Sequence, residues 1–161
     1  MLEKKDKKWY AAKVFFNKTA PIANILRSDS VDFFIPPFPS LLFLNTDTHY
    51  LRHFQYEQSS HLWIYSDRTT HHPSAIPNSE MEQFKQVCTL TDQGLTLLGD
   101  DKPEYHQGQL VRITDGPFKG IVGHVKRIKK DRRVVVAING VVAVATTFIH
   151  PSLLEPIDNP Q

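Results

Sequence analysis

The side chains that could bind a metal or act as a nucleophile are eight histidines and one cysteine. His71 and His72 are adjacent, and the other histidines are scattered along the chain. A zinc or iron site needs three or four convergent ligands, and this pattern predicts none. Cys88 is expected on an apolar helix face with no histidine in a motif beside it, which favours a buried thiol over a nucleophile. The sequence therefore predicts no catalytic residue, metal ligand or cofactor, and we expect a protein that is not an enzyme.

A short basic run near the C-terminus is the strongest charge feature of the chain. Its six members occupy eight positions beside a lone Asp131, and they are Lys126, Arg127, Lys129, Lys130, Arg132 and Arg133. Such a run is either a solvated turn between strands or a contact with a polyanion, and the sequence leaves both readings open. The nearby run Asp115-Gly116-Pro117-Phe118-Lys119-Gly120 is a turn and lacks the pattern of a phosphate-binding loop.

Composition places these features in a globular chain of 161 residues, with 40% apolar and 22% charged side chains. One cysteine excludes a disulfide framework and favours a reducing compartment, so we expect a cytoplasmic protein. No apolar run is long enough to span a membrane, and no signal peptide is visible. Residues 9–107 carry seven basic and eleven acidic side chains, whereas residues 108–161 carry eight basic and four acidic ones. This contrast predicts two units with different partners.

The first part of the chain alternates between strand and helix patterns. Aromatic and β-branched residues predict a strand over residues 9–16, and a helix is expected over 19–28. Further strands are expected over 32–36, 40–45 and 62–65, with a helix over 46–58. Ser79 followed by Glu82 forms a capping box that opens a last helix, which should end near Thr91. This order indicates an α+β unit.

The second part of the chain has a β-only pattern. Residues 92–107 are rich in Gly, Asp, Pro and Gln and are expected to form a flexible linker. About five short strands follow between residues 109 and 156, and Asn139-Gly140 is a strong hairpin signal. Five short strands in about 50 residues suggest a small closed barrel. Nine β-branched side chains between residues 133 and 147 oppose a helix there, so we expect this part to stay β.

Three segments resemble a known family. Residues 108–123 resemble the KOW motif through their Asp-Gly-Pro-Phe turn and the glycine that follows it. Residues 7–11 resemble the opening strand of the NGN domain, and residues 38–44 resemble its Phe-Pro-Gly-Tyr-Val-type strand. An NGN-like part followed by a KOW-like part is similar to the domain order of the NusG family of transcription elongation factors, over residues 8–157. The short chain is more similar to the specialised UpxY and RfaH types than to general NusG.

The resemblance implies a fold and a domain plan. It implies an α+β NGN-like domain at residues 8–91, built from an antiparallel sheet with helices. A linker at 92–107 and an all-β, SH3-like KOW barrel at 108–157 would follow. RfaH-type relatives can store the second domain as a helical hairpin against the first. The β-branched run argues against that here, so the NGN site should stay open.

The resemblance also implies a mechanism and site residues. The NGN domain of the family presents an apolar depression to the clamp helices of RNA polymerase and suppresses pausing or termination. The residues that would line it are Tyr10, Phe38, Leu41 and Phe43, with the sheet core as the alternative for Phe43. Arg52 and His53 match a second polymerase contact, with a solvated helix face as the alternative.

The KOW domain of the family recruits a further partner, such as a ribosomal protein or the Rho factor. Its hairpin tip carries an aromatic residue in general NusG, where this chain has Ile138-Asn139-Gly140. The basic run would touch nascent RNA or a ribosomal protein. The alternative function is an RNA-binding or ribosome-associated KOW protein that acts through the same run. In either case we expect a bacterial monomer that has no membrane partner.

Overall fold

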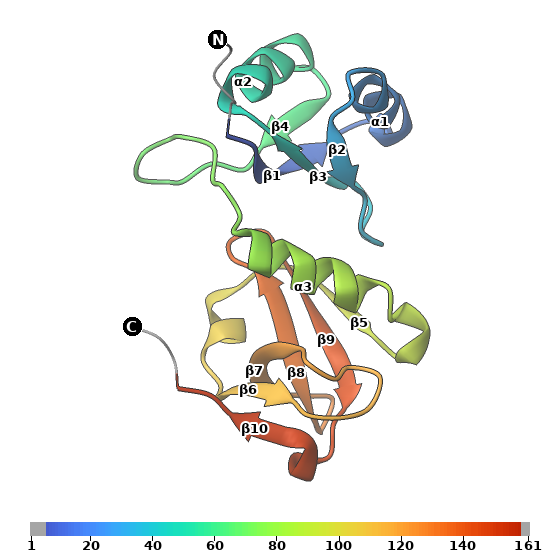
Figure 1. The fold of residues 1–161 in the computed structure, drawn as a ribbon, viewed down its shortest axis with the longest axis vertical. Helices are drawn as coiled ribbons and strands as arrows, with labels where there is room; N and C mark the ends of the chain where they lie inside the picture. Colours follow the sequence, from blue (N-terminus) through green and yellow to red (C-terminus); the bar gives the residue numbers. More distant parts are fainter. Residues whose placement is uncertain (1–5, 159–161) are drawn as a thin grey trace. The chain divides into compact units, whose positions relative to one another are not determined.

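A computed structural model describes residues 6–158 of the chain. The chain divides into two compact units, Met1–Met81 and Glu82–Gln161. The division falls inside α3 (Asn78–Cys88), earlier than the domain end expected near residue 91. The described residues form three α-helices and two antiparallel sheets, so the expected α+β class is confirmed for the chain (Figure 1).

The first unit is built on a four-stranded antiparallel sheet. Its strands are β1 (Lys8–Val14), β2 (Asp32–Phe34), β3 (Leu41–Thr46) and β4 (Leu62–Ile64), in the order β2-β3-β1-β4. Each of these strands was expected from the sequence. Pro36, Pro37 and Pro39 lie in the connection between β2 and β3, as expected for residues that cannot donate to a ladder.

Two helices, α1 (Thr19–Ser28) and α2 (Thr48–Glu57), lie on the same side of this sheet (Figure 1). Their apolar stripes bury Ile22 and Leu26 from α1 and Leu51 and Phe54 from α2 against the sheet. Asp47 caps α2, because its carboxylate accepts a hydrogen bond of 2.8 Å from the backbone N–H of Tyr50.

Alternation along each strand decides which side chains meet the helices. The members of this core that the strands contribute are Tyr10, Ala12, Val14, Leu42, Leu44, Leu62 and Ile64. Each is separated from the next member of its own strand by two positions, so all of them point to the helix side. The intervening residues must therefore point to the other side of the sheet.

The second unit is built on a six-stranded antiparallel sheet. Its strands are β5 (Thr96–Asp100), β6 (Leu110–Ile113), β7 (Val122–Ile128), β8 (Asp131–Ile138), β9 (Val142–Phe148) and β10 (Leu154–Pro156). Their order is β10-β6-β7-β8-β9-β5. The β-only pattern and the absence of a helix over residues 133–147 are confirmed. The hydrogen-bonded order is open at β10 and β5, and closure into a barrel stays a prediction.

The expected flexible linker at residues 92–107 is wrong for most of its length. It contains the 3₁₀ turn η1 (Thr91–Gln93), strand β5 and a second 3₁₀ turn, η2 (Pro103–His106). β5 pairs with β9, with a bulge between Leu97 and Gly99. Gly99 has φ +95°, a conformation that glycine adopts without strain. The same glycine that suggested a loop therefore allows a bulged strand.

Within the second unit, α3 is fixed to the sheet by the side chain of Gln83. Its amide donates to the carbonyl oxygen of Val122 at 2.8 Å and accepts from the N–H of Val122 at 2.8 Å. The amide thus supplies both hydrogen bonds that a strand would otherwise give to the first residue of β7. Because both backbone groups of Val122 are satisfied in this way, β7 can begin there.

Candidate functional site

The face of the first sheet opposite α1 and α2 is the main candidate site, and we call it the outer face. The strand register places Leu41, Lys13 and Trp63 in one row across β3, β1 and β4. The next row contains Phe34, Phe43 and Ala11 on β2, β3 and β1. Five of these six side chains are apolar, and among these five Trp63 is the exposed one.

Burial divides the outer face into a floor and a rim. Phe43 is fully buried and Leu41 is 6% exposed, whereas 47% of Trp63 is exposed. The rings of Phe34 and Phe43 stack with centroids 6.3 Å apart, and Trp63 packs edge-on against Tyr65 at 4.8 Å. Leu41 and Phe43 therefore form a rigid floor, and Trp63 is the aromatic side chain that a partner can reach first.

The predicted site residues are only partly brought together. Leu41 and Phe43 share the outer face, as their spacing predicted, although both are buried. Phe38 lies half-buried in the connection between β2 and β3. Tyr10 was expected beside them, and the structure corrects this: its cross-strand neighbour is Leu44, and both belong to the core under α1 and α2. The outward residue is Trp9, because adjacent residues of a strand point to opposite faces.

Trp63 is a candidate that sequence reasoning missed. It lies in the run Leu62-Trp63-Ile64-Tyr65, which was expected only as a strand. Leu62 and Ile64 are buried in the helix-side core, so Trp63 between them must face outward. The alternation within this run was the available signal.

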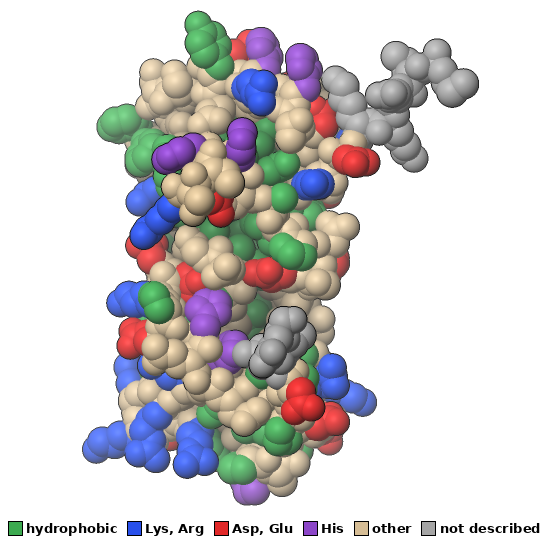
Figure 2. Space-filling model, turned by 90° about the vertical axis from the view of Figure 1, so that its left-hand side faces the viewer, with side chains coloured by type: hydrophobic (Ala, Val, Ile, Leu, Met, Phe, Trp, Pro, Cys, Tyr) green, Lys and Arg blue, Asp and Glu red, His purple; other side chains and the backbone are tan. Residues whose placement is uncertain are grey.

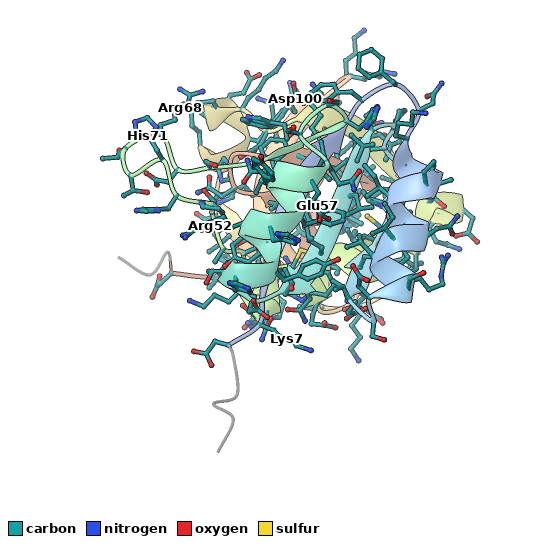
Figure 3. The ribbon with its side chains drawn as sticks, turned by 90° about the horizontal axis from the view of Figure 1, so that it is seen from above. Lys7, Arg52, Glu57, Arg68, His71 and Asp100 are labelled. Atoms are coloured by element: carbon teal, nitrogen blue, oxygen red, sulfur yellow. The ribbon has the colours of Figure 1, made fainter. Side chains whose placement is uncertain are left out.

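Arg52 and His53 are adjacent on α2, but their side chains have different surroundings. Arg52 lines a cavity of about 370 Å³ together with Tyr10, Gln55 and the loop residues His71 and His72. Figure 3 shows Arg52 on α2 and His71 on the loop that follows β4. His53 lies elsewhere on α2, two-thirds exposed, with its Nε2 2.9 Å from the carboxylate of Glu57. A second polymerase contact at Arg52 and His53 stays a prediction.

The basic run lies on the β7–β8 hairpin of the second unit. Figure 2 shows Lys and Arg side chains gathered at the lower left of the view. Lys126 is held by Glu104 at 3.7 Å, and its ammonium lies 5.9 Å from the ring centre of Tyr105. Arg133 donates to the hydroxyl of Thr96 at 2.8 Å. The structure thus separates two engaged cations from the rest of the run.

Among the described residues, no three or more His, Cys, Asp or Glu side chains are grouped so that they could hold a metal ion. Over the same residues, none of the helices combines the length and the apolar character that crossing a membrane requires.

Cys88 is predicted to be unreactive in the folded protein. The thiol is 8% exposed, and burial raises its pKa to about 12. With this pKa, almost no thiolate is present near neutral pH. The thiolate is the reactive nucleophile, so the folded chain should react slowly. We expect iodoacetamide at pH 8 to label the native chain at least about 100-fold more slowly than the chain unfolded in urea. Mass spectrometry of the two time courses measures this ratio, and equal rates would contradict the burial of the thiol.

Comparison with known proteins gives matches to a family model and to solved structures. A family model described as the KOW motif matches residues 107–136. A solved structure titled "Domain interaction in Thermotoga maritima NusG" matches with a TM-score of 0.51 and 18% sequence identity, over 95% of this chain and 98% of that chain. No curated protein sequence matches. The chain therefore combines a KOW motif with a NusG-like fold.

Proposed function

We propose that this protein is a NusG-type transcription elongation or antitermination factor that binds RNA polymerase through the outer face of its first sheet. The observation that carries the proposal is the paired rows of that face, with Leu41 and Phe43 as a buried floor and Trp63 as an exposed rim. The KOW motif and the NusG-like fold support the assignment to transcription.

In this proposal the outer face receives helices of the polymerase clamp. Aromatic side chains on a rigid sheet bury a large area with little loss of side-chain entropy, as binding hot spots require. The protein needs no covalent chemistry for this role, because it acts by binding one clamp state better than another. Its effect on pausing can be no larger than that difference in affinity.

The second unit is proposed to close into an SH3-like barrel and to recruit a further partner of the transcription machinery in the bacterial cytoplasm. The short β2–β3 connection supports a specialised factor of the UpxY or RfaH type. The tip at Asn139 and Gly140 is exposed and lacks an aromatic side chain. We therefore propose that its partner differs from those of general NusG.

Replacing Trp63 by alanine tests the proposal. We expect the variant to bind purified bacterial core RNA polymerase more weakly by about 1–2 kcal/mol, and Phe38→Ala to act in the same direction. Biolayer interferometry with the full-length chain measures the dissociation constants. The matched control is Tyr56→Ala, because Tyr56 lies on α2 with 81% of its surface exposed. Equal affinity of W63A and the unmodified chain, both folded by circular dichroism, would refute the assignment of the outer face.

A further inference from the structure

The cavity of about 370 Å³ in the first unit has a lining suited to an anion. One wall is a single face of α2, the other wall is the loop that follows β4, and β1 contributes one buried side chain (Figure 3). The residues that line it are Tyr10, Thr48, Leu51, Arg52, Gln55, His71, His72 and Pro73. None of these residues is acidic, and six of the eight can donate a hydrogen bond from the side chain.

The loop wall is fixed by hydrogen bonds of its own. One carboxylate oxygen of Asp67 accepts from the backbone N–H groups of Thr69 and Thr70, at 2.8 and 2.9 Å. The backbone N–H of Asp67 donates to the carbonyl oxygen of His72 at 2.9 Å, and the N–H of His71 donates to the carbonyl oxygen of Asp67 at 2.8 Å. These bonds to its carboxylate lower the pKa of Asp67. The acidic side chain of the loop is therefore occupied in shaping the wall.

The cations of the cavity lack a protein counter-charge. Within residues 6–158, Arg52, His71 and His72 take part in no ion pair. The carboxylates of α2 and of its cap are engaged elsewhere, because Asp47 caps the helix and Glu57 lies beside another histidine of the helix. A guanidinium group without a counter-charge at a cavity that has no acidic lining favours an anionic ligand there.

Tyr10 gives a second and independent indication of a ligand. Its side chain is 3% exposed and lines the cavity, yet its hydroxyl forms no hydrogen bond with another residue of the described range 6–158. A buried tyrosine hydroxyl usually has a hydrogen-bond partner. Burial and then the charge of Asp47 raise its pKa, so the hydroxyl stays a neutral donor near neutral pH. An anion in the cavity would supply the missing acceptor.

We propose that this cavity binds a small phosphate monoester, with the phosphate group held by Arg52, the two histidines and the hydroxyl of Tyr10. Six donor side chains are more than the roughly four acceptor positions of a carboxylate can use, whereas a phosphate group has three strongly accepting oxygens. Leu51 and Pro73 offer contacts to an apolar organic part of the ligand. The volume exceeds the need of a phosphate ion and lies at the lower end of the range of small-molecule sites. The proposal does not depend on polymerase binding.

An NMR titration of the ¹⁵N-labelled full-length chain tests the proposal. The probes are phenyl phosphate, inorganic phosphate, benzoate and benzyl alcohol. We expect phenyl phosphate to bind with a Kd of about 1 mM, as is ordinary for a compound of its size, and to shift the amide signals of α2 and residues 66–72. Inorganic phosphate and benzoate should bind about 10-fold more weakly, and the neutral benzyl alcohol should not bind. Equal affinity for benzoate, or shifts spread over other surfaces of the chain, would contradict a phosphate site in the cavity.

Three variants separate a built site from general attraction by charge. R52Q and Y10F should each weaken phenyl phosphate binding by about 10-fold, since each loses a hydrogen bond to a charged group. Y10F should melt as the unmodified chain does, because the hydroxyl has no partner in the described protein to lose. R68Q is the matched control, since Arg68 is exposed on the same loop and does not line the cavity (Figure 3). Unchanged affinity in R52Q or in Y10F, or an equal loss in R68Q, would overturn the proposal.

A nucleic-acid backbone is the other source of phosphate groups, and the same titration distinguishes it. A phosphodiester lacks the doubly charged terminal group, and its chain continues on both sides, so it does not fit inside a small cavity. A short single-stranded DNA without a terminal phosphate should therefore leave the signals of α2 and residues 66–72 unchanged and should not displace phenyl phosphate. Displacement by this DNA that is weakened in both R52Q and Y10F would assign the cavity to a nucleic-acid backbone and refute a small ligand.

Discussion

Replacing Gly123 by alanine is expected to unfold the second unit near physiological temperature. A Cβ at this position would overlap the backbone carbonyl oxygen of Val135 and lie 2.8 Å from Cγ1 of Val134. Both belong to β8, the strand next to β7, so the new atom can be accommodated only if the two strands separate. We expect a loss of about 3 kcal/mol, at the upper end of the cost of overpacking.

Calorimetry of the full-length chain measures this loss, because the two units can melt in separate transitions. The transition of the second unit should fall by about 10–20 °C. Lys119→Ala is the control, since Lys119 is exposed in the turn that precedes β7. A G123A transition within a few degrees of the unmodified chain would show that β7 and β8 are not packed as described.

Removing the carboxylate of Asp101 should produce the second large effect. This side chain is 4% exposed and accepts from Nε2 of His106 at 2.8 and 3.0 Å. It also accepts from the backbone N–H of Gly140 at 2.8 Å, and so fixes the β8–β9 turn. Asp101→Ala leaves both donors without this acceptor, and we expect a loss of about 2–3 kcal/mol from the free energy of unfolding.

Two related variants apportion this effect. Asp101→Asn keeps one carbonyl oxygen for the Gly140 N–H and should lose less than the alanine variant. His106→Ala should lose least, because the His106 side chain is 35% exposed and water can replace it. Hydrogen exchange at the Gly140 amide follows the turn directly, and it should accelerate in D101A before the strands open. Slow exchange of that amide in D101A would show that the turn does not need the carboxylate.

Local patterns were sufficient to predict most of the fold. The pattern at Ser79 and Glu82 correctly indicated a helix, although α3 begins at Asn78 and Ser79 lies in its first turn and not at its N-cap. The β-branched residues between 133 and 147 indicated strands, and β8 and β9 occupy that segment. Such signals lie within a few neighbouring residues, so they can be read without knowing the tertiary contacts.

Features that depend on tertiary contacts were missed. Tyr10 and Trp9 are both apolar, and only the position of α1 and α2 decides that Tyr10 points to them. β5 was taken as linker because its sequence contains glycine and aspartate, and its partner β9 lies more than 40 residues away. The two engaged cations of the basic run could not be recognised either, since Glu104 and Thr96 come from a different part of the chain.

The position of β5 has a consequence for any attempt to produce the KOW part of the second unit, residues 108–157, alone. β5 precedes β6 in the chain, yet it covers the free edge of β9 at the far side of the sheet. A fragment that begins at residue 108 would lack β5 and leave the backbone groups of β9 unpaired along that edge. The sequence of β9 is uncharged, contains neither proline nor glycine and is rich in valine and threonine. These are the properties of segments that assemble edge to edge, so we expect such a fragment to aggregate where the full-length chain stays dispersed.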